Sequence, residues 1–267
     1  MIRSIVSKPP RFFISMRKYL FFTIILLLLF TSCVTTRRAE LESAYVPDSF
    51  EWEEVCPGVA RYDFENRGIP LIYHAVKIDL NLVDLICARG VRAADFAASE
   101  KPVVLINANP FDKSGTLVGL HREAGRNLSA PVARYAAIGF RENEARVFES
   151  QVAEELEDFD YAFGGFFVVL KDGEVCGDFL RRGDSRSGAG VTADGRTLYL
   201  LVVEGERPQK SRGLSYPQCG EIFLAMGCRD ALEFDGGGSS DLCINGRSVM
   251  SYRVSRVHGN CFGFKLR

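Results

Sequence analysis

The stretch SYPQCGEIFLAMGCRDALEFDGGGSS, residues 215–240, contains the clearest succession of elements in the chain. Ser215 is a favourable helix N-cap and Pro217 fits a first helical turn, so a helix is predicted to begin here. Gly227 is a typical residue for its end. Residues 231–234 are then predicted to form a strand that runs directly into Asp235 and three glycines.

Most of the chain around this unit is predicted to form short strands joined by tight turns. Three pairs of apolar runs flank polar turns, two of them Asp-Gly turns: 135–140 with 144–148, 166–170 with 174–176, and 188–192 with 197–203. Further strands are expected at 71–80, 84–89 and 103–107, and a short helix at 91–99. No Pro- or Ser-rich linker divides this region. The predicted fold is therefore a single α+β domain, with a mixed, hairpin-rich β-sheet and a few helices.

The first residues have the features of an export signal. A basic segment precedes an apolar run at 19–30, which is shorter than the ~20 residues needed to span a bilayer. Thr31-Ser32-Cys33 then resembles a lipobox, in which the cysteine is acylated. We therefore expect a lipoprotein signal peptide at 1–33, lipid anchoring through Cys33 at a bacterial cell envelope, a flexible tether at 34–51 and a domain at 52–267. An uncleaved signal anchor is the alternative.

Composition and charge limit the classes of function. The 267 residues are 47% apolar and 25% charged, with a formal net charge of −1, as in an ordinary folded protein. Near-neutrality argues against a nucleic-acid partner, because a phosphate backbone requires a basic surface.

Seven cysteines follow Cys33, and an odd number cannot all form disulfides with one another. No CxxC motif or Cys/His cluster has zinc-site spacing, so we expect buried thiols with at most one bridge. No metal or cofactor is indicated, and a divalent cation at Asp235 or Asp241 would have no spacing signature.

The segment FDGGGSSDL, residues 234–242, is the strongest candidate for a site. An acid stands at the end of an apolar strand. Three glycines, Gly236, Gly237 and Gly238, would let the backbone approach a ligand closely, and Ser239 and Ser240 would add hydrogen-bond donors. The alternative is a hairpin turn, but such a turn needs only one or two glycines.

Three other positions could contribute. Asn107 ends a buried strand, where ligand-contacting groups often lie, although a turn before Pro110 is as good an explanation. Arg186 could hold a phosphate or carboxylate in its planar fork, and a solvated basic turn is the alternative. Glu204 ends another apolar strand and could pair with Asp235, because glycosidases generally use two carboxylates. Among the three histidines, His74 is interpreted as a packed structural residue.

Together and in this order, these segments resemble the phosphodiester glycosidase family. The matching segments are Lys77-Ile78-Asp79-Leu80, Asn107-Ala108-Asn109-Pro110-Phe111, Gly164-Gly165, Lys171-Asp172-Gly173, Arg186-Ser187, Val203-Glu204-Gly205-Glu206, Gly213-Leu214-Ser215, Asp235 to Ser240, and Arg256 with Asn260. The family's Gly-Gly after the first asparagine is Ala108-Asn109 here, its aspartate is Glu204, and its following arginine is Glu206. The resemblance spans roughly residues 55–264.

The resemblance implies hydrolysis of the bond between a sugar's anomeric carbon and a phosphodiester oxygen. It assigns catalysis to Asp235 with Glu204, and substrate binding to Asn107, Arg186, the 236–240 loop, Arg256 and Asn260. The partner would be a carbohydrate or sugar phosphate. Two alternatives remain: a glycosidase acting on a non-phosphorylated polysaccharide, and a non-catalytic carbohydrate-binding envelope lipoprotein. Retention of both acids favours catalysis, because a protein that only binds could lose them.

Overall fold

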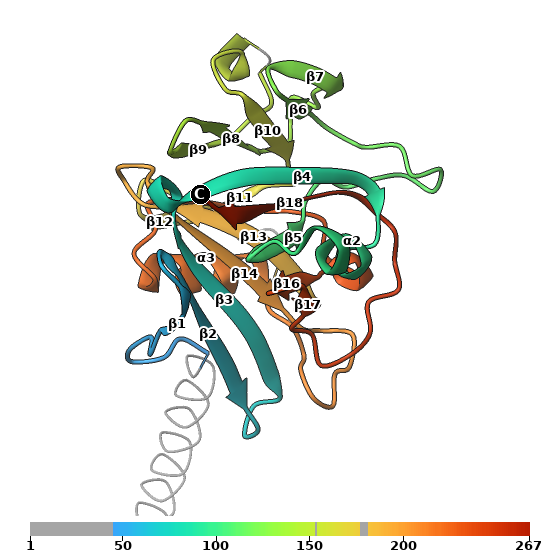
Figure 1. The fold of residues 1–267 in the computed structure, drawn as a ribbon. Coiled ribbons are helices and arrows are strands. Elements are labelled where there is room, and N and C mark those ends of the chain that lie inside the picture. Colours follow the sequence, from blue (N-terminus) through green and yellow to red (C-terminus); the bar gives the residue numbers. More distant parts are fainter. Residues whose placement is uncertain (1–44, 153, 177–180) are drawn as a thin grey trace, which may run out of the picture. The chain divides into compact units, whose positions relative to one another are not determined.

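An eight-stranded antiparallel sheet forms the base of the fold (Figure 1). The computed structural model describes residues 45–152, 154–176 and 181–267. The predicted signal peptide, Cys33 and most of the predicted tether lie outside these residues. In spatial order the sheet contains β1 (Glu53–Cys56), β2 (Val59–Asn66), β3 (Leu71–Asp79), β14 (Thr197–Val203), β13 (Arg186–Val191), β15 (Asp230–Glu233), β11 (Val168–Lys171) and β12 (Glu174–Val175).

Two five-stranded antiparallel sheets complete the described part of the chain. One contains β7 (Arg126–Ser129), β6 (His121–Glu123), β10 (Tyr161–Gly164), β8 (Ala137–Arg141) and β9 (Glu144–Phe148). The other contains β17 (Arg247–Ser248), β16 (Leu242–Ile244), β5 (Val104–Asn107), β18 (His258–Leu266) and β4 (Val83–Val91). Short 3₁₀ turns lie at Leu80–Leu82, Glu154–Leu156 and Gly237–Ser239.

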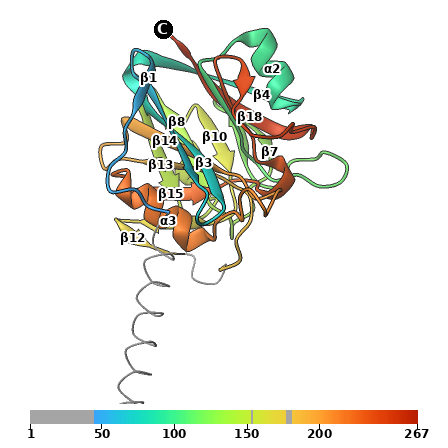
Figure 2. The ribbon, with the colours of Figure 1, turned by 90° about the horizontal axis from the view of Figure 1, so that it is seen from below.

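Two α-helices cover different sheets, as Figure 2 shows. α3 (Tyr216–Ala225) packs on β11, β12 and β15, whereas α2 (Ala93–Glu100) packs on the five-stranded sheet of β5 and β16. The N-terminus of α3 has the predicted cap: the Ser215 backbone N–H donates to Gln218 Oε1 at 2.9 Å, and proline occupies the first turn. No helix in the described part of the chain is long and apolar enough to cross a membrane.

One apolar core lies between the three sheets. Val76 and Leu200 from the large sheet, Phe163 from the second and Phe262 from the third all belong to it. The rings of Phe163 and Phe262 stack with their centroids 4.6 Å apart. Burial of these side chains from all three sheets makes residues 46–267 one compact unit.

The structure confirms the predicted α+β fold with hairpin-rich sheets and few helices. The sheet was expected to be mixed, but every pairing between the strands of the described residues is antiparallel. All three predicted hairpins are present, as β8–β9, β11–β12 and β13–β14. The seven cysteines of the described residues are free thiols.

Antiparallel pairing brings several strand ends to one edge of each of two sheets. In the large sheet, Arg186 at the start of β13 pairs with Val203 at the end of β14, and Gly188 pairs with Glu233 at the end of β15. In the sheet of β5, Asn107 at its end pairs with Cys261 near the start of β18. The loop after β15 connects these two edges, and the candidate site is built on it.

Candidate active site

The glycine-rich loop is hydrogen-bonded to both sheet edges. The Asp235 N–H donates to the Ala108 carbonyl at 2.9 Å, and the Asn107 side-chain amide donates to the Asp235 carbonyl at 2.7 Å. Two residues later, the Gly237 N–H donates to the Ser185 carbonyl at 2.9 Å. The backbone of the loop is therefore fixed on the side of each sheet, whatever the state of the Asp235 side chain.

The three glycines of this loop have different surroundings. A Cβ on Gly236 would lie 2.8 Å from the Ser185 carbonyl oxygen, so the close approach of these two segments requires glycine. Gly237 has a φ of +57° and nothing within 4 Å of its Cβ position. A Cβ on Gly238 would meet only the ends of Arg256 and Glu206, at 3.8–3.9 Å. Gly236 thus serves packing, while Gly237 and Gly238 leave backbone open to a ligand.

Asp235 is a partly buried carboxylate beside a cation. Burial raises its pKa above the usual value, while the Ser239 hydroxyl, the Arg256 guanidinium and the Gly236 N–H act in the opposite direction. Arg256 is exposed and its Nη1 donates to Ser239 Oγ at 3.3 Å. The site therefore places a carboxylate and a guanidinium together at the open part of the loop.

A second guanidinium, that of Arg186, is held rigidly nearby. Its Cα lies 3.9 Å from the Cβ position of Gly236. Its Nε donates to the Leu214 carbonyl and its Nη2 to the Arg182 carbonyl, both at 2.9 Å. The guanidinium also lies over the Tyr216 ring, 4.5 Å from the centroid. These bonds use two of the five N–H donors of an arginine, so the group is oriented and still able to bind an anion.

The predicted substrate residues Asn107 and Asn260 lie beneath the loop. Asn107 is buried, and its Oδ1 accepts from Ser187 Oγ at 2.8 Å and from the Asp241 N–H at 3.0 Å. Asn260 is also buried and bonds to Asn109 through the Asn109 N–H at 2.7 Å. Both amides are used within the fold: Asn107 supports the loop directly, and Asn260 supports the segment of Ala108 and Asn109, to which the loop is bonded. Their predicted role in substrate contact stays untested.

Asn109, which stands where the family has glycine, links three segments. Its Nδ2 donates to the Leu120 carbonyl at 2.9 Å, and its Oδ1 accepts from the Gly164 N–H at 3.1 Å and from Asn260 at 2.9 Å. The side chain therefore adds a buried hydrogen-bond network at a position that glycine would leave without one.

Glu204 ends β14 as predicted, but its carboxylate faces inward. The residue is 1% exposed. Its Oε1 accepts from the Ser251 N–H at 2.6 Å and lies 3.4 Å from His74 Nε2, while its Oε2 accepts from Ser251 Oγ at 2.5 Å. Burial raises the pKa of Glu204, but the bonds from His74 and Ser251 outweigh it and hold that pKa below the usual value. Glu204 is thus an ionised group committed to protein partners.

Comparison with known proteins now adds to this geometry. Residues 100–265, well over half of the chain, match the family model described as phosphodiester glycosidase. The chain belongs to the phosphodiester glycosidase family. This confirms the resemblance inferred from the ordered motifs, and the matched region contains the whole glycine-rich loop.

Solved structures share the fold of this chain, and a curated relative is similar in sequence. The catalytic domain of zebrafish N-acetylglucosamine-1-phosphodiester α-N-acetylglucosaminidase superposes with a TM-score of 0.64 at 18% identity, over 80% of this chain and 86% of that one. A hypothetical protein from Synechocystis gives a TM-score of 0.70 at 14% identity, over 83% and 64%. At these identities the likeness shows the fold. The prophage-derived protein YomE of Bacillus subtilis is 28% identical over 174 residues, and the match covers 57% of this chain and 26% of YomE. The chain thus spans about a quarter of that relative's length.

Sequence reasoning about this family member missed Glu233. It precedes Asp235 by two residues and is 1% exposed, and neither carboxylate oxygen has a conventional hydrogen-bond partner among the described residues. Burial raises its pKa to about 8, against the opposing effects of Arg186 and the Cys219 thiol. An acid within the otherwise apolar run 231–234 was the available signal.

One trio in the described part of the chain has the composition of a metal site. The ligand atoms of Cys87, His121 and Glu123 lie within 4.8 Å of one another. However, Asn260 Nδ2 donates to His121 Nδ1 at 2.7 Å, which places the ring proton on Nε2, the nitrogen facing Glu123 at 3.7 Å. Burial lowers the pKa of His121 to about 4, so the ring is neutral and offers this trio an N–H rather than a lone pair. The arrangement does not fit a metal-ligating histidine.

Proposed function

We propose that this phosphodiester glycosidase hydrolyses the bond between the anomeric carbon of a sugar and the oxygen of a phosphodiester. The observation that carries the proposal is the Asp235 carboxylate held beside Arg256 on a loop whose Gly237 and Gly238 backbone is open. Family membership supports the reaction type. The zebrafish enzyme of similar fold is named for cleavage of an N-acetylglucosamine-1-phosphodiester, which supports a sugar-1-phosphodiester as the class of substrate.

The chemistry requires opposite charges at the two ends of the breaking bond. As the bond between carbon and oxygen breaks, its electron pair leaves with the phosphate and positive charge develops at the anomeric carbon. A carboxylate stabilises that carbon, and guanidinium groups stabilise the departing phosphate. Water then supplies the oxygen that bonds to the carbon and gives up a proton. A phosphate monoester is a good leaving group, so this reaction needs little help from a general acid.

The described residues can be assigned to these tasks. We assign Asp235 to the anomeric carbon, where its ionised form is required. Arg256 and Arg186 are assigned to the phosphate, because both are guanidinium groups near the loop with donors to spare. The backbone of Gly237 and Gly238 is assigned to the surface against which the sugar would lie, and the buried Ser239 supports it.

Glu204 is assigned a supporting role in place of direct attack. Its carboxylate is buried and bonded to Ser251, which belongs to the segment that carries Arg256. Asn107 supports the other side of the loop through its bond to the Asp235 carbonyl, and Asn260 supports the neighbouring segment at Asn109. In this proposal the second carboxylate keeps the phosphate-binding arginine in place.

We also propose that the protein is exported and anchored to the envelope by a lipid on Cys33. The support is the basic, apolar and Thr-Ser-Cys succession of residues 1–33. Metabolic labelling with a radioactive fatty acid tests it. The label should enter the wild-type protein and be absent from Cys33→Ser, and equal labelling of both would refute acylation at this residue.

Hydrolysis of a substrate panel tests the proposed reaction. The purified protein is given sugar-1-phosphodiesters and plain aryl glycosides, with Asp235→Asn and the exposed control Asp172→Asn alongside. We expect free sugar only from the phosphodiesters. Asp235→Asn should lose this activity, and Asp172→Asn should keep it. Activity only on plain glycosides would instead support the alternative of a glycosidase that acts on a non-phosphorylated polysaccharide. Full activity in Asp235→Asn would refute the central assignment.

A further inference from the structure

The bonds between Glu204 and Ser251 fix one end of a segment that has no regular structure. This segment, residues 249–257, connects β17 to β18 and will be called the Arg256 segment. Both carboxylate oxygens of Glu204 accept from Ser251, one from its N–H and one from its hydroxyl. The segment is also held by the Val249 N–H bond to the Leu242 carbonyl, by the Arg256 bond to Ser239, and by Met250 and Val254, which belong to the apolar core. The bonds to Glu204 thus help to position the Arg256 guanidinium.

His74 lies between Glu204 and a second carboxylate. Its Nε2 is 3.4 Å from Glu204 Oε1, and its Nδ1 is 2.6 Å from Asp63 Oδ1. The His74 side chain is 11% exposed and that of Glu204 is 1% exposed, whereas that of Asp63 is 46% exposed. A neutral imidazole has one donor nitrogen and one acceptor nitrogen, so it would turn a lone pair toward one of the carboxylates. Only the imidazolium ion donates to both.

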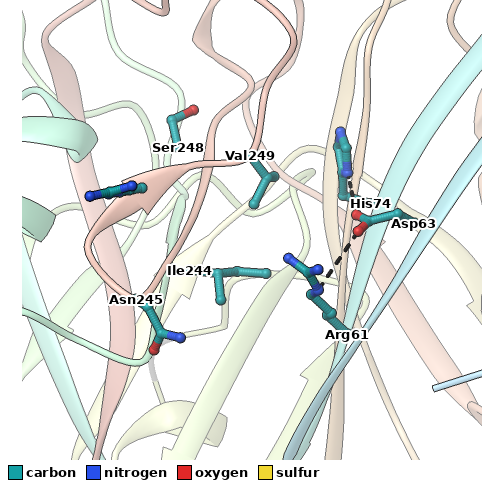
Figure 3. A pocket seen from close by; sticks show the side chains of 8 residues that line it. Arg61, Asp63, His74, Ile244, Asn245, Ser248 and Val249 are labelled. Carbon is teal, nitrogen blue, oxygen red and sulfur yellow. Dashed lines mark hydrogen bonds and ion pairs between the residues drawn. The ribbon is translucent and has the colours of Figure 1, made fainter. Parts of the chain in front are cut away.

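Asp63 and His74 line a cleft that is open to solvent. The cleft has a volume of about 540 Å³ and lies between β2–β3 and the β16–β17 hairpin. Figure 3 shows Asp63 pointing toward His74, with Arg61 on its other side. Arg61 Nε lies 3.8 Å from Asp63 Oδ2, and Arg247 also lines the cleft. Protons can therefore reach His74 from the cleft without passing the proposed substrate site.

We propose that His74 is a positioning residue whose imidazolium form holds Glu204 against Ser251 and so fixes the Arg256 segment in the proposed active site. The proposal rests on the proposed function for its catalytic consequence, but its structural part stands on the contacts above. It assigns a role to a histidine that the sequence indicated only as structural. It also gives the ionised, buried Glu204 a positive partner.

The direction of the pH dependence follows from the neighbours of His74. Burial lowers the pKa of His74, but the hydrogen bonds and charges of Asp63 and Glu204 outweigh it and raise that pKa above the usual value. Of the cations that face the group, Arg61 lies beyond Asp63, and Arg247 lines the same cleft. His74 is thus protonated at pH values below its raised pKa. The Arg256 segment should be held there and should loosen as the pH rises through that value.

Hydrogen exchange of the Arg256 segment tests this directly on the full chain. Protection factors, corrected for the intrinsic pH dependence of exchange, are measured across pH 5–9 without substrate. In the wild type we expect protection to fall by about tenfold or more as His74 loses its proton, the effect of weakening charge-assisted hydrogen bonds. His74→Gln should show the lower protection at every pH. Ser251→Ala should show it too, while the His74 pKa measured by NMR stays raised.

A surface variant keeps the test decisive if His74→Gln does not fold. Asp63→Asn removes a carboxylate that supports the imidazolium, so the loss of protection should move to lower pH. Glu65→Gln, an exposed acid on the same strand that pairs with Arg67, should leave the transition unchanged. Equal transitions in Asp63→Asn and wild type would overturn the proposal, as would unchanged protection in His74→Gln.

Activity adds a second readout. If the wild type cleaves phosphodiesters, the alkaline limb of its kcat/KM profile should coincide with the exchange transition and move with it in Asp63→Asn. If the limb stays in place while the exchange transition moves, the positioning role is refuted. A wild type that cleaves no phosphodiester refutes the proposed function, and the exchange experiment still decides the role of His74.

Discussion

Replacing Glu233 with glutamine should remove a large loss of stability that the protein undergoes between pH 5 and pH 8. The side chain is fully buried and its pKa is raised by burial to about 8, from an ordinary value of 4.5. The folded state therefore holds this proton more tightly than the unfolded state. The stability linked to it is fully present below pH 4.5 and is lost as the pH rises through about 8. Linkage gives a loss of about 3.5 kcal/mol between pH 5 and pH 8.

Urea unfolding of the wild type and Glu233→Gln at several pH values in this range is the assay. Other groups titrate there too, so the quantity of interest is the difference in unfolding free energy between the two proteins as a function of pH. That difference should move in favour of the variant by about 3.5 kcal/mol between pH 5 and pH 8. Glu174→Gln, an exposed acid on β12 of the same sheet, is the control and should track the wild type.

Parallel pH profiles for the wild type and Glu233→Gln would refute the reasoning. They would mean that Glu233 is ionised in the folded protein and has a compensating partner. The point matters for the site, because a neutral Glu233 leaves the charge of Arg186 available to a phosphate. An ionised Glu233 would compensate the charge of Arg186 within the protein.

Gly236→Ala should destabilise the fold by about 1–3 kcal/mol in urea unfolding, because its Cβ would meet the Ser185 carbonyl at 2.8 Å. Gly238→Ala should destabilise it by less than about 1 kcal/mol. Equal losses of stability in the two variants would contradict the packing described. Arg256→Gln should raise KM for phosphodiesters and move the acidic limb of the pH profile upward, since Arg256 lowers the pKa of Asp235; an unmoved limb would separate the two groups. Zn²⁺ should not raise the melting temperature by binding to His121. If zinc stabilised the wild type but not Cys87→Ser, this would show that the Asn260 amide does not fix the His121 ring.

Much of the fold could be predicted from the sequence wherever local chemistry decides structure. The α3 cap at Ser215 and the hairpin turns depend on neighbouring residues, and their elements lie within a few residues of the predicted bounds. The strands β1, β2, β6, β7, β10, β16, β17 and β18 were not predicted. β18 pairs with β4 and β5, far away in the sequence, and it is buried on both faces, so it lacks the alternation that marks a half-exposed strand.

The candidate site was likewise predicted only where neighbouring residues determine it. The acid and glycines of 235–238 were evident from their unusual succession, and the structure places them at an open loop. That the side chains of Asn107 and Asn260 lie beneath the loop could not be read from the sequence, because it depends on how two sheet edges meet. The contact of His74 with Glu204, 130 residues later, likewise exists only in the folded chain.

Hydrolysis in water enriched in ¹⁸O shows directly whether the bond to the anomeric carbon is the bond that breaks. The purified protein is given a sugar-1-phosphodiester, and the phosphate monoester released is analysed by mass spectrometry. Cleavage between the anomeric carbon and oxygen places the oxygen of water on the sugar. We therefore predict a phosphate monoester without ¹⁸O, which the wild type forms and Asp235→Asn does not. One ¹⁸O in the phosphate would show attack at phosphorus, and the protein would then be a phosphodiesterase rather than a glycosidase.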